Sequence, residues 1–397
     1  MVEQHEKTLV PQIRFAGFTD PWEQRKLGEF GSVAMCKRIY KEQTSEQGDV
    51  PFFKIGTFGA NPDAFISNEL FEDFKCIYPY PTPGTLLISA AGSIGRVVEY
   101  QGEKAYFQDS NIVWLEHDHR LNDAFLKPLY SRIEWGLEGS TIKRLYNKDL
   151  LSAEVTVPGG REQKEIGQFF AKLDNLITLH QRKYDKLCVL KKSMLDKMFP
   201  KGGSLYPEIR FSGFTDPWEQ RKLGELFEES DERASDREIL SVSVANGIYP
   251  ASESDRETNP GASLANYKIV HFGDVVYNSM RMWQGAVDAS RYDGIVSPAY
   301  VVARPNSEVY ARFFARLLRQ PMLLKQYQQV SQGNSKDTQV LKFDDFASIG
   351  ISMPVSENEQ RQIGGFFDRL DSLITLHQRK LELLRNIKKS MLDKMFV

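Results

Sequence analysis

The sequence predicts an α+β protein built from two tandem copies of one plan, in which a variable domain of mixed sheet and helices is followed by a long helix. Two duplications support this prediction. The segment EQKEIGQFFAKLDNLITLHQRKYDKLCVLKKSMLDKMF at Glu162–Phe199 returns at Glu359–Phe396 with about two-thirds of its positions identical. A shorter motif, PQIRFAGFTDPWEQRKLGE, at Pro11–Glu29 returns at Pro207–Glu225 as PEIRFSGFTDPWEQRKLGE. The nearly equal offsets of the two duplications predict a pseudo-two-fold internal repeat over the whole chain.

Each long segment is predicted to be one uninterrupted helix with an apolar seam. Apolar residues recur at spacings of three and four, at Leu173, Ile177, Tyr184, Leu187, Met194 and Met198 and again at Leu370, Ile374, Leu381, Leu384, Met391 and Met395. Such a heptad pattern needs a partner helix, so we expect the two helices to pack on each other. At about 1.5 Å per residue, each would form a rod of roughly 55 Å.

The seam also has polar positions, at His180, Lys191, His377 and Lys388. Polar seam residues tend to fix the register of a helix pair at some cost in stability. We interpret the two histidines in this way rather than as metal ligands, because no Cys, Asp or Glu stands beside them at ligand spacing.

The variable domains diverge in sequence but show the same order of elements. The predicted divisions are residues 1–29 (leader and short motif), 30–158 (first variable domain), 159–200 (first long helix), 201–225 (linker and second short motif), 226–354 (second variable domain) and 355–397 (last helix). Apolar runs bounded by Gly and Pro predict a curved, mostly antiparallel sheet in each domain, with strands at 51–58, 84–100, 104–116, 153–158, 238–249, 273–290, 294–305 and 348–354. Helices are predicted at 123–137, broken near Pro128, and at 309–329, interrupted at Pro321. We expect Trp22 and Trp218 of the short motifs to be packing anchors.

Composition excludes several classes of protein. Hydrophobic residues make up 41% and charged residues 26% of the 397 residues, as is typical of soluble globular proteins. No stretch approaches the roughly 18 apolar residues of a membrane span, and the first residues lack the apolar core of a signal peptide. The cysteines, at 36, 76 and 188, are too scattered for a disulfide framework or a zinc site, which fits a reducing cytoplasm.

The net charge of −2 does not by itself indicate a nucleic-acid partner. Both variable domains carry slightly more acidic than basic residues, whereas the long helices are basic. Any DNA-binding face must therefore be local and be created by folding.

A search for catalytic motifs finds no phosphate loop, no HExxH and no GxSxG elbow. The two histidines of the polar turn EHDHRLND, His117 and His119, are expected to be exposed rather than to bind metal. The segment AAGSIGR at Ala90–Arg96 resembles half of a nucleotide-binding loop, but it lacks the following helix and Lys, so it is predicted to be a strand-turn-strand. Its counterpart is NSMRMWQGA at Asn278–Ala286. Two interpretations of these segments stay open. Either their backbone allows close approach to a ligand, or they are plain hairpin turns.

One scaffold carrying two different domains fits the recognition of two different features at a fixed separation. On B-DNA, neighbouring modules are spaced by about 34 Å, one helical turn. The residues that carry a family resemblance are the repeated motifs FxGFTDPWEQRKLGE and EQxxIGxFFxxLDxLITLHQRK and the patterns GTLLISAAGSIGRV, YFQDSNIVWL and GDVVYNSMRMWQGAV. In these residues the chain resembles the specificity subunit of a type I restriction–modification system. The resemblance extends from about residue 10 to the end of the chain.

This resemblance implies a function. Each variable domain would be a target recognition domain that reads one half of a split, asymmetric site on double-stranded DNA. The two helices would pair as an antiparallel coiled coil, set the length of the unread spacer and dock two methyltransferase subunits, which use S-adenosylmethionine for adenine-N6 methylation. Restriction subunits, which use ATP and Mg, would join the complex. The chain itself would hold no cofactor or metal, catalyse nothing, and work in the bacterial cytoplasm without a membrane.

DNA-contacting residues are predicted from side-chain chemistry and position in loops. Arg reads guanine, Asn or Gln reads adenine, and Ser or Thr reads either. In the first domain the candidates for base contact are Ser89, Ser93, Arg96, Gln108 and Asn111, and those for phosphate contact are Lys143, Arg144 and Lys148. In the second domain they are Asn246, Tyr249, Asn278, Arg281, Trp283, Gln284 and Tyr300, with Lys336 on a phosphate.

An alternative is a protein-only scaffold, a coiled-coil clamp whose two domains bind protein partners. The apolar seam fits both hypotheses, and the acidic domains favour the scaffold. Affinity for duplex DNA that falls steeply with salt would favour the DNA-specificity hypothesis. An independent nuclease or methyltransferase is disfavoured, because the sequence contains no catalytic motif or cofactor loop.

Overall fold

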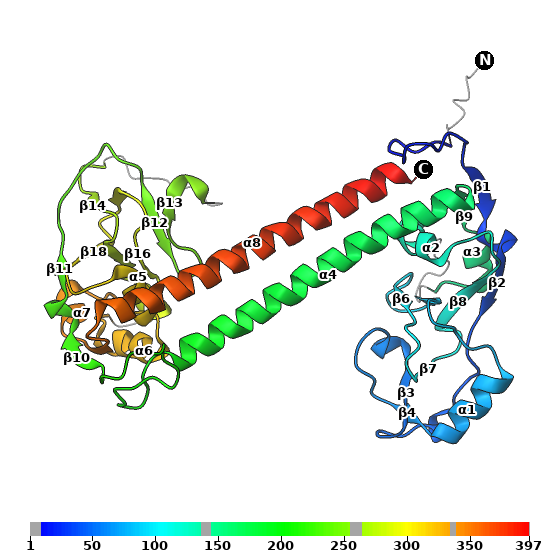
Figure 1. The fold of residues 1–397 in the computed structure, drawn as a ribbon, viewed down its shortest axis with the longest axis horizontal. Helices are drawn as coiled ribbons and strands as arrows, with labels where there is room; N and C mark the ends of the chain where they lie inside the picture. Colours follow the sequence, from blue (N-terminus) through cyan, green and yellow to red (C-terminus); the bar gives the residue numbers. More distant parts are fainter. Residues whose placement is uncertain (1–8, 136–143, 255–263, 334–338, 397) are drawn as a thin grey trace, which may run out of the picture. The chain divides into compact units, whose positions relative to one another are not determined.

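The computed structural model describes residues 9–135, 144–254, 264–333 and 339–396. The chain divides into two compact units. The first unit contains the chain up to His180 together with the stretch from Lys380 onward, and the second unit is Gln181–Arg379. Both long helices, α4 (Gly160–Lys197) and α8 (Glu357–Met395), run from one unit into the other (Figure 1). Each unit therefore contains a part of both helices.

The first unit is built around an antiparallel sheet of four strands in the order β2-β8-β5-β6. These strands are β2 (Gly31–Ala34), β8 (Ile112–His117), β5 (Leu86–Ser89) and β6 (Val97–Glu99). A second sheet has the order β4-β3-β7, and β1 pairs with β9, the strands being β4 (Phe65–Ile66), β3 (Val50–Phe53), β7 (Tyr106–Phe107), β1 (Glu23–Lys26) and β9 (Glu154–Val157). The helices are α1 (Asn68–Ile77), α2 (Asp123–Tyr130) and α3 (Asn147–Ser152).

The second unit repeats this plan with a sheet in the order β11-β18-β15-β16. Its strands are β11 (Phe227–Glu229), β18 (Tyr300–Pro305), β15 (Val275–Asn278) and β16 (Val287–Ala289). Three further pairs are β12 (Leu240–Ser243) with β13 (Gly247–Pro250), β14 (Lys268–Val270) with β17 (Gly294–Val296), and β10 (Glu219–Lys222) with β19 (Gly350–Met353). The helices are α5 (Ala311–Leu317), α6 (Pro321–Val330) and α7 (Phe343–Ala347).

The predicted plan is confirmed, with local differences. The described strand pairs are antiparallel except for β3 and β7, which pair in parallel. The predicted strand at 51–58 ends at Phe53 and continues as a 3-10 helix, and helix α1 was not predicted. The predicted helix at 123–137 ends at Tyr130, two residues after Pro128. Short 3-10 helices lie at Leu27–Glu29, Lys41–Gln43, Ile55–Thr57, Leu223–Glu225, Ala251–Glu253 and Met282–Gln284.

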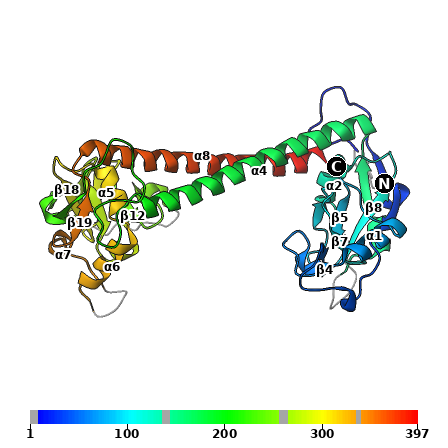
Figure 2. The same ribbon diagram turned by 60° about the horizontal axis from the view of Figure 1, so that its bottom comes forward.

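The end of each long helix is packed in the core of the unit in which that helix ends. In the first unit, Phe396 after α8 lies 6.0 Å from Trp22, measured between ring centroids. In the second unit, Phe199 after α4 lies 6.1 Å from Trp218. Both tryptophans are fully buried, as predicted for packing anchors. Because α4 begins in the first unit and ends in the second, and α8 does the reverse, the helix pair is antiparallel (Figure 2).

The two seam lysines pair with aspartates of the opposite helix. Lys388 Nζ lies 2.6 Å from Asp174 in the first unit, and Lys191 Nζ lies 2.5 Å from Asp371 in the second unit. The two pairs occupy the same positions of the repeat. A slip of one helix along the other would separate the charges in both pairs, so these contacts favour one register.

The first turn of each long helix is fixed to the variable domain that precedes it. Arg14 forms a fork with Glu162, with both N–O distances 2.7 Å, and Gln163 binds backbone groups of that domain. The Gln163 amide accepts from the Asn122 N–H and donates to the carbonyls of Arg120 and Pro158. In the second unit Arg210 pairs with Glu359, and Gln360 makes the matching contacts with Tyr310 N–H, Glu308 O and Pro354 O. The repeated Glu-Gln dipeptide thus has a structural role in both units.

Candidate nucleic-acid interface

The loop between β5 and β6 (residues 90–96) and the loop between β15 and β16 (residues 279–286) occupy equivalent places. In the first unit, Ala90 N–H donates to Asn111 O at 2.8 Å, and Ala90 O accepts from Leu145 N–H at 2.9 Å. In the second unit, Ser279 makes the same two contacts, donating to Ala299 O and accepting from Leu341 N–H. We call these two segments the reading loops. Their equivalence, and the strand-turn-strand form of residues 90–96, agree with the sequence prediction.

The shape of the first reading loop is set by Ser89. This serine is buried, and its hydroxyl donates to the carbonyl of Ser93 and accepts the N–H of Arg96 at 3.0 Å. Gly95 has φ +76°, and a Cβ at this position would lie 2.4 Å from Trp135 Nε1, so only glycine fits. Ser89 therefore holds the loop, and the side chains of Ser93 and Arg96 remain exposed upon it.

Beside this loop lies a cavity of about 240 Å³, lined by Ile55, Gly56, Phe58, Ser89, Gly92, Ser93 and Arg96. The Arg96 guanidinium donates to Gly59 O at 3.3 Å across the rim. Gln108 supports one wall, because its side-chain oxygen accepts from Ile55 N–H at 2.9 Å. Four predicted residues, Ser89, Ser93, Arg96 and Gln108, thus lie around one concave surface.

The turn before β8 brings further predicted residues to the same place. Arg144 donates to Ser110 O at 2.8 Å, next to Asn111, whose carbonyl holds the reading loop. Arg38, which was not predicted, lies beside them because its Nε donates to Asp109 at 2.8 Å. No local pattern marks Arg38, since its position depends on the pairing of strands distant in sequence. Lys148 is exposed on α3, and Lys143 lies outside the described residues.

The second unit gathers its predicted residues on two neighbouring hairpins. Asn278, Arg281, Trp283 and Gln284 belong to β15 and the second reading loop, with Arg281 and Gln284 exposed. Tyr300 is the register partner of Asn278 in β18, and its hydroxyl lies 3.5 Å from Ser241 Oγ of β12. The β12–β13 hairpin carries Asn246, which is exposed, and Tyr249, which is partly buried. Lys336 lies outside the described residues.

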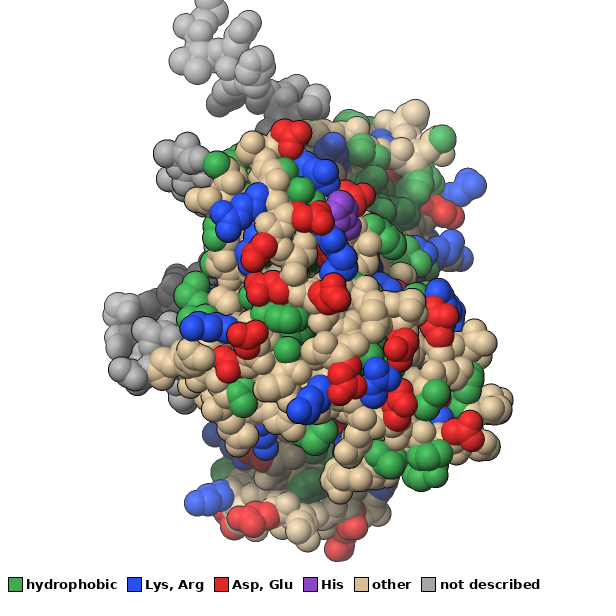
Figure 3. Space-filling model, turned by 90° about the vertical axis from the view of Figure 1, so that its left-hand side faces the viewer, with side chains coloured by type: hydrophobic (Ala, Val, Ile, Leu, Met, Phe, Trp, Pro, Cys, Tyr) green, Lys and Arg blue, Asp and Glu red, His purple; other side chains and the backbone are tan. Residues whose placement is uncertain are grey.

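Some polar side chains near the second reading loop are buried or make hydrogen bonds within the protein. The side-chain oxygen of Asn278 accepts from Met280 N–H at 3.0 Å, which fixes the start of the loop. The Trp283 Nε1–H is buried and has no hydrogen-bond partner among the described residues. On the face seen in Figure 3, basic and acidic side chains of the described residues lie next to one another. Because both variable domains carry slightly more acidic than basic residues, contacts by individual loop residues, rather than a broad basic surface, would decide what the reading loops bind.

His117 is less exposed than its polar sequence context predicts, with a side chain 11% exposed. Its Nε2 lies 2.9 Å from Asp123 and its Nδ1 lies 2.9 Å from the carbonyl of Asp118. The hydrogen bond to Asp123 raises the pKa of His117 above its ordinary value of 6.5, against the opposing effect of burial. Within the part of the chain that the structure describes, no three His, Cys, Asp or Glu side chains come together to hold a metal ion.

We expect His117 to make the first unit more stable in mild acid. Because its folded pKa is raised, the stability it contributes is fully present below pH 6.5 and is lost as the pH rises through the folded pKa. Melting temperatures of the wild type and of His117→Gln, compared from about pH 5.5 to about pH 8.5, should therefore converge as the pH rises. A difference that widens with pH would contradict this assignment.

Comparisons with known proteins agree on one family. The sequence model described as the type I restriction modification DNA specificity domain matches twice, at residues 19–188 and 215–386. A type I restriction enzyme specificity subunit of Haemophilus influenzae, S.HindORF215P, is 50% identical over 153 residues, or 38% of this chain. That match spans 40% of the length of the Haemophilus protein.

Among solved structures, the crystal structure of the type I restriction–modification S subunit from M. genitalium matches with a TM-score of 0.62. The match has 16% sequence identity and covers 98% of this chain and 99% of the other, so it shows the fold. No helix among the described residues has the length and apolar character needed to cross a membrane. The two matches of the family model cover most of the chain and coincide with its two repeats, and the chain belongs to the family of type I restriction–modification specificity subunits.

Proposed function

We propose that each variable domain, at residues 30–158 and 226–354, reads one half of a split, asymmetric site on double-stranded DNA. The observation that carries this proposal is the equivalence of the two reading loops. They are held by the same backbone hydrogen bonds but present different side chains, Ser93 and Arg96 in one unit and Arg281 and Gln284 in the other. One framework with two different surfaces is suited to reading two different sequences.

Within this proposal, the exposed arginines and amides read base edges. Arg96 and Arg281 are proposed to bind guanine, and Gln284 or Asn246 to bind adenine. Arg144 and Lys148 are proposed to contact phosphates, as are Lys143 and Lys336. Ser89, Gln108 and Asn278 make hydrogen bonds within the protein that shape the loops, so their contribution to DNA binding includes positioning of their neighbours. Asn111, Tyr249, Trp283 and Tyr300 complete the proposed interface.

The antiparallel helices are proposed to set the length of the unread spacer and to bind two methyltransferase subunits. The support is a repeated apolar surface. On α4, Leu176 and Leu179 are 43% and 47% exposed, and on α8 their repeat counterparts Leu373 and Leu376 are 44% and 45% exposed. Exposed leucines at equivalent positions of both repeats fit two copies of one partner.

The partners would supply the chemistry. Methylation by those subunits would use S-adenosylmethionine, and restriction subunits would use ATP and Mg. This chain would contribute specificity without catalysis, in the bacterial cytoplasm where the DNA lies.

Replacing one leucine pair should release one partner. Leu176→Ser with Leu179→Ser should weaken binding at one of the two surfaces, because each exposed Leu contributes about 1–3 kcal/mol when it is buried on binding. Mass measurement of the assembled complex should then show one methyltransferase subunit instead of two, and changing all four leucines should show none. Val189→Ser is the matched control, since Val189 is 69% exposed on α4 but its repeat counterpart is Asn386. Loss of both subunits from the α4 variant alone would contradict two independent surfaces.

The decisive experiment is methylome sequencing of a host without other methyltransferases that expresses this chain with and without the methyltransferase subunit. A split motif methylated at adenine only when both are present would support the proposal. If no motif appears, although the methyltransferase subunit is active with another specificity chain, the proposal fails.

The protein-scaffold hypothesis remains as the second candidate, favoured by the slight excess of acidic residues in both variable domains. The salt dependence of duplex binding separates the two. A protein that contacts several phosphates loses affinity steeply as salt rises, whereas a protein scaffold has no such affinity for duplex DNA to lose.

A further inference from the structure

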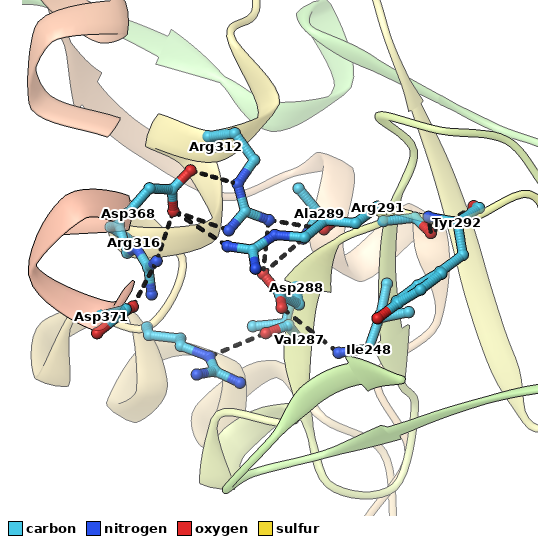
Figure 4. Close-up of polar contacts among 12 residues, drawn as sticks. Ile248, Val287, Asp288, Ala289, Arg291, Tyr292, Arg312, Arg316, Asp368 and Asp371 are labelled. Atoms are coloured by element: carbon cyan, nitrogen blue, oxygen red, sulfur yellow. Dashed lines mark hydrogen bonds and ion pairs between the residues drawn. The ribbon is translucent and has the colours of Figure 1, made fainter. Parts of the chain in front are cut away.

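Three arginines, two on α5 and one in the turn that follows it, connect α8 with the hairpins of the second unit that carry the candidate DNA-contacting residues. We call Arg312, Arg316 and Arg319 the arginine cluster; Figure 4 labels the first two together with Asp368 and Asp371. On the side of α8, Arg312 forms a fork with Asp368, with N–O distances of 3.0 and 2.8 Å. Arg316 lies 2.9 Å from the same carboxylate and 2.7 Å from Asp371. The side chains of Arg312 and Arg316 are only 12% and 10% exposed.

On the opposite side, the arginine cluster binds the sheet. Arg312 donates to Ala289 O at 2.9 Å and lies 3.6 Å from Asp288. Arg319 donates to Val287 O at 2.9 Å and to Ser243 O at 3.4 Å. The hydrogen-bond acceptors are backbone carbonyls of β16 and β12. The guanidinium groups therefore hold the backbone of these two strands in place.

Those carbonyls lie at the bases of the two hairpins that carry the candidate reading residues. Val287 directly follows the second reading loop, and Ser243 directly precedes the β12–β13 turn with Asn246. Asp288 fixes the other end of that turn, because it accepts from Ile248 N–H at 3.4 Å. The neighbouring Gly247 has φ +67°, and a Cβ there would lie 2.1 Å from the Asp288 carboxylate, so the close approach requires glycine.

The first unit lacks this arrangement. Gln163 and Gln360 bind Asn122 N–H and Tyr310 N–H in the two units, which aligns α2 with α5. By this alignment, the residues in place of the arginine cluster are Ala124, Pro128 and Ser131. The residue in place of Asp368 is Ala171, by the repeat of the long helices. The cluster is thus specific to the second unit and is not needed for the shared scaffold.

The energetics favour a role in positioning. Burial would raise the pKa of Asp368, but the hydrogen bonds and charges of Arg312 and Arg316 hold it below its ordinary value, so the carboxylate stays ionised. Buried ion pairs of this kind contribute little net stability relative to apolar packing, but breaking one leaves a buried charge unpaired, which favours a single geometry. One donor of the cluster, Arg316 Nε, is buried without a hydrogen-bond partner among the described residues.

We propose that the arginine cluster positions the second reading loop and the β12–β13 turn against α8, so that Arg319 controls how strictly the second half of the DNA site is read. This inference rests on the proposed function. Arg319 is a positioning residue, since it contacts the bases of both hairpins and not the exposed reading side chains.

The test uses the full chain assembled with its methyltransferase subunits. Methylation rates are measured on DNA carrying single wrong bases in either half of the site. Arg319→Met should lower discrimination in the second half by roughly tenfold, about the effect of one lost base contact, and leave the first half unchanged. Arg319→Lys, which keeps the charge, should lose only about threefold. Arg291→Met is the matched control, because Arg291 contacts Asp368 at 3.3 Å, is 55% exposed, and should have no effect.

The outcomes separate the alternatives. Equal loss of discrimination in both halves, or a lower rate at all sites with unchanged discrimination, would overturn the positioning role. If Arg319→Met does not fold in melting experiments, Arg319→Lys carries the test, and unchanged discrimination in that variant would refute the inference. A wild-type complex that shows no split target would instead refute the proposed function.

Discussion

Glu359→Gln is expected to lower the free energy of unfolding by about 3 kcal/mol, since removing one partner of a buried ion pair leaves the other charge unpaired. The Glu359 side chain is 1% exposed and forms a fork with Arg210 at 2.6 and 2.8 Å. One of its oxygens also accepts from the Trp218 indole N–H at 3.3 Å. The carboxylate therefore joins the short motif, the start of α8 and the core of the second unit. Urea denaturation of the full chain would measure the effect.

The repeat supplies a comparison within the same molecule. Glu162 forms the equivalent fork with Arg14, but the Trp22 indole N–H has no hydrogen-bond partner among the described residues. Glu162→Gln should therefore lower the free energy of unfolding somewhat less than Glu359→Gln does. Glu23→Gln, at an exposed pair with Arg25, should leave stability nearly unchanged. A loss at Glu359 no larger than that of this surface control would show that the fork does not hold the helix to its domain.

Exchange of residues 30–158 for the corresponding segment of another specificity subunit is expected to change one half of the methylated sequence completely and leave the other half intact. The reason lies in how the scaffold holds this domain. Gln163 binds the backbone of residues 120, 122 and 158, and β1 pairs with the backbone of β9. A foreign domain of the same fold supplies these groups whatever its side chains are. Methylome sequencing of the chimera would read the outcome, and a change in both halves would contradict it.

The protein should tolerate exchange of residues 226–354 less well than exchange of residues 30–158. The first domain contacts α8 by an exposed pair, Arg132 with Asp393, whereas the second domain is joined to α8 through the largely buried side chains of Arg312 and Arg316. A foreign domain without these two arginines would leave Asp368 partly buried and unpaired. We expect such a chimera to recover stability and yield when Asp368→Ala is added, because Ala171 occupies this position in the first repeat. Equal yields of the chimera with and without Asp368→Ala would argue against a link between the second domain and α8 through Asp368.

Much of the architecture is encoded locally and could be predicted. The repeated Trp and seam positions, the interruption before Pro321 and the equivalence of the two reading loops follow from motifs and periodicities within short stretches. The predicted break near Pro128 was placed too early, because α2 continues through Pro128 to Tyr130. Helix α1 escaped prediction because it is short and buries little apolar surface, with Phe71 as its one fully buried residue. Of the interface, the sequence indicated the loops and the chemical types of their side chains.

Only the tertiary structure decided which of those side chains shape the loops and which face outward. Ser89 belongs to the same sequence pattern as Ser93 and Arg96, yet its side chain is buried and holds the loop backbone while theirs are exposed. The pattern around Gln108 likewise did not show that its side-chain oxygen accepts from Ile55 N–H. Local sequence patterns likewise did not predict the position of Arg38 or the arginine cluster. They also did not predict that Phe199 and Phe396 pack in the cores of the units where their helices end. All depend on contacts between residues far apart in the chain, for which local periodicity carries no signal. The sequence by itself determined the repeated scaffold, and long-range packing determined which residues that scaffold presents.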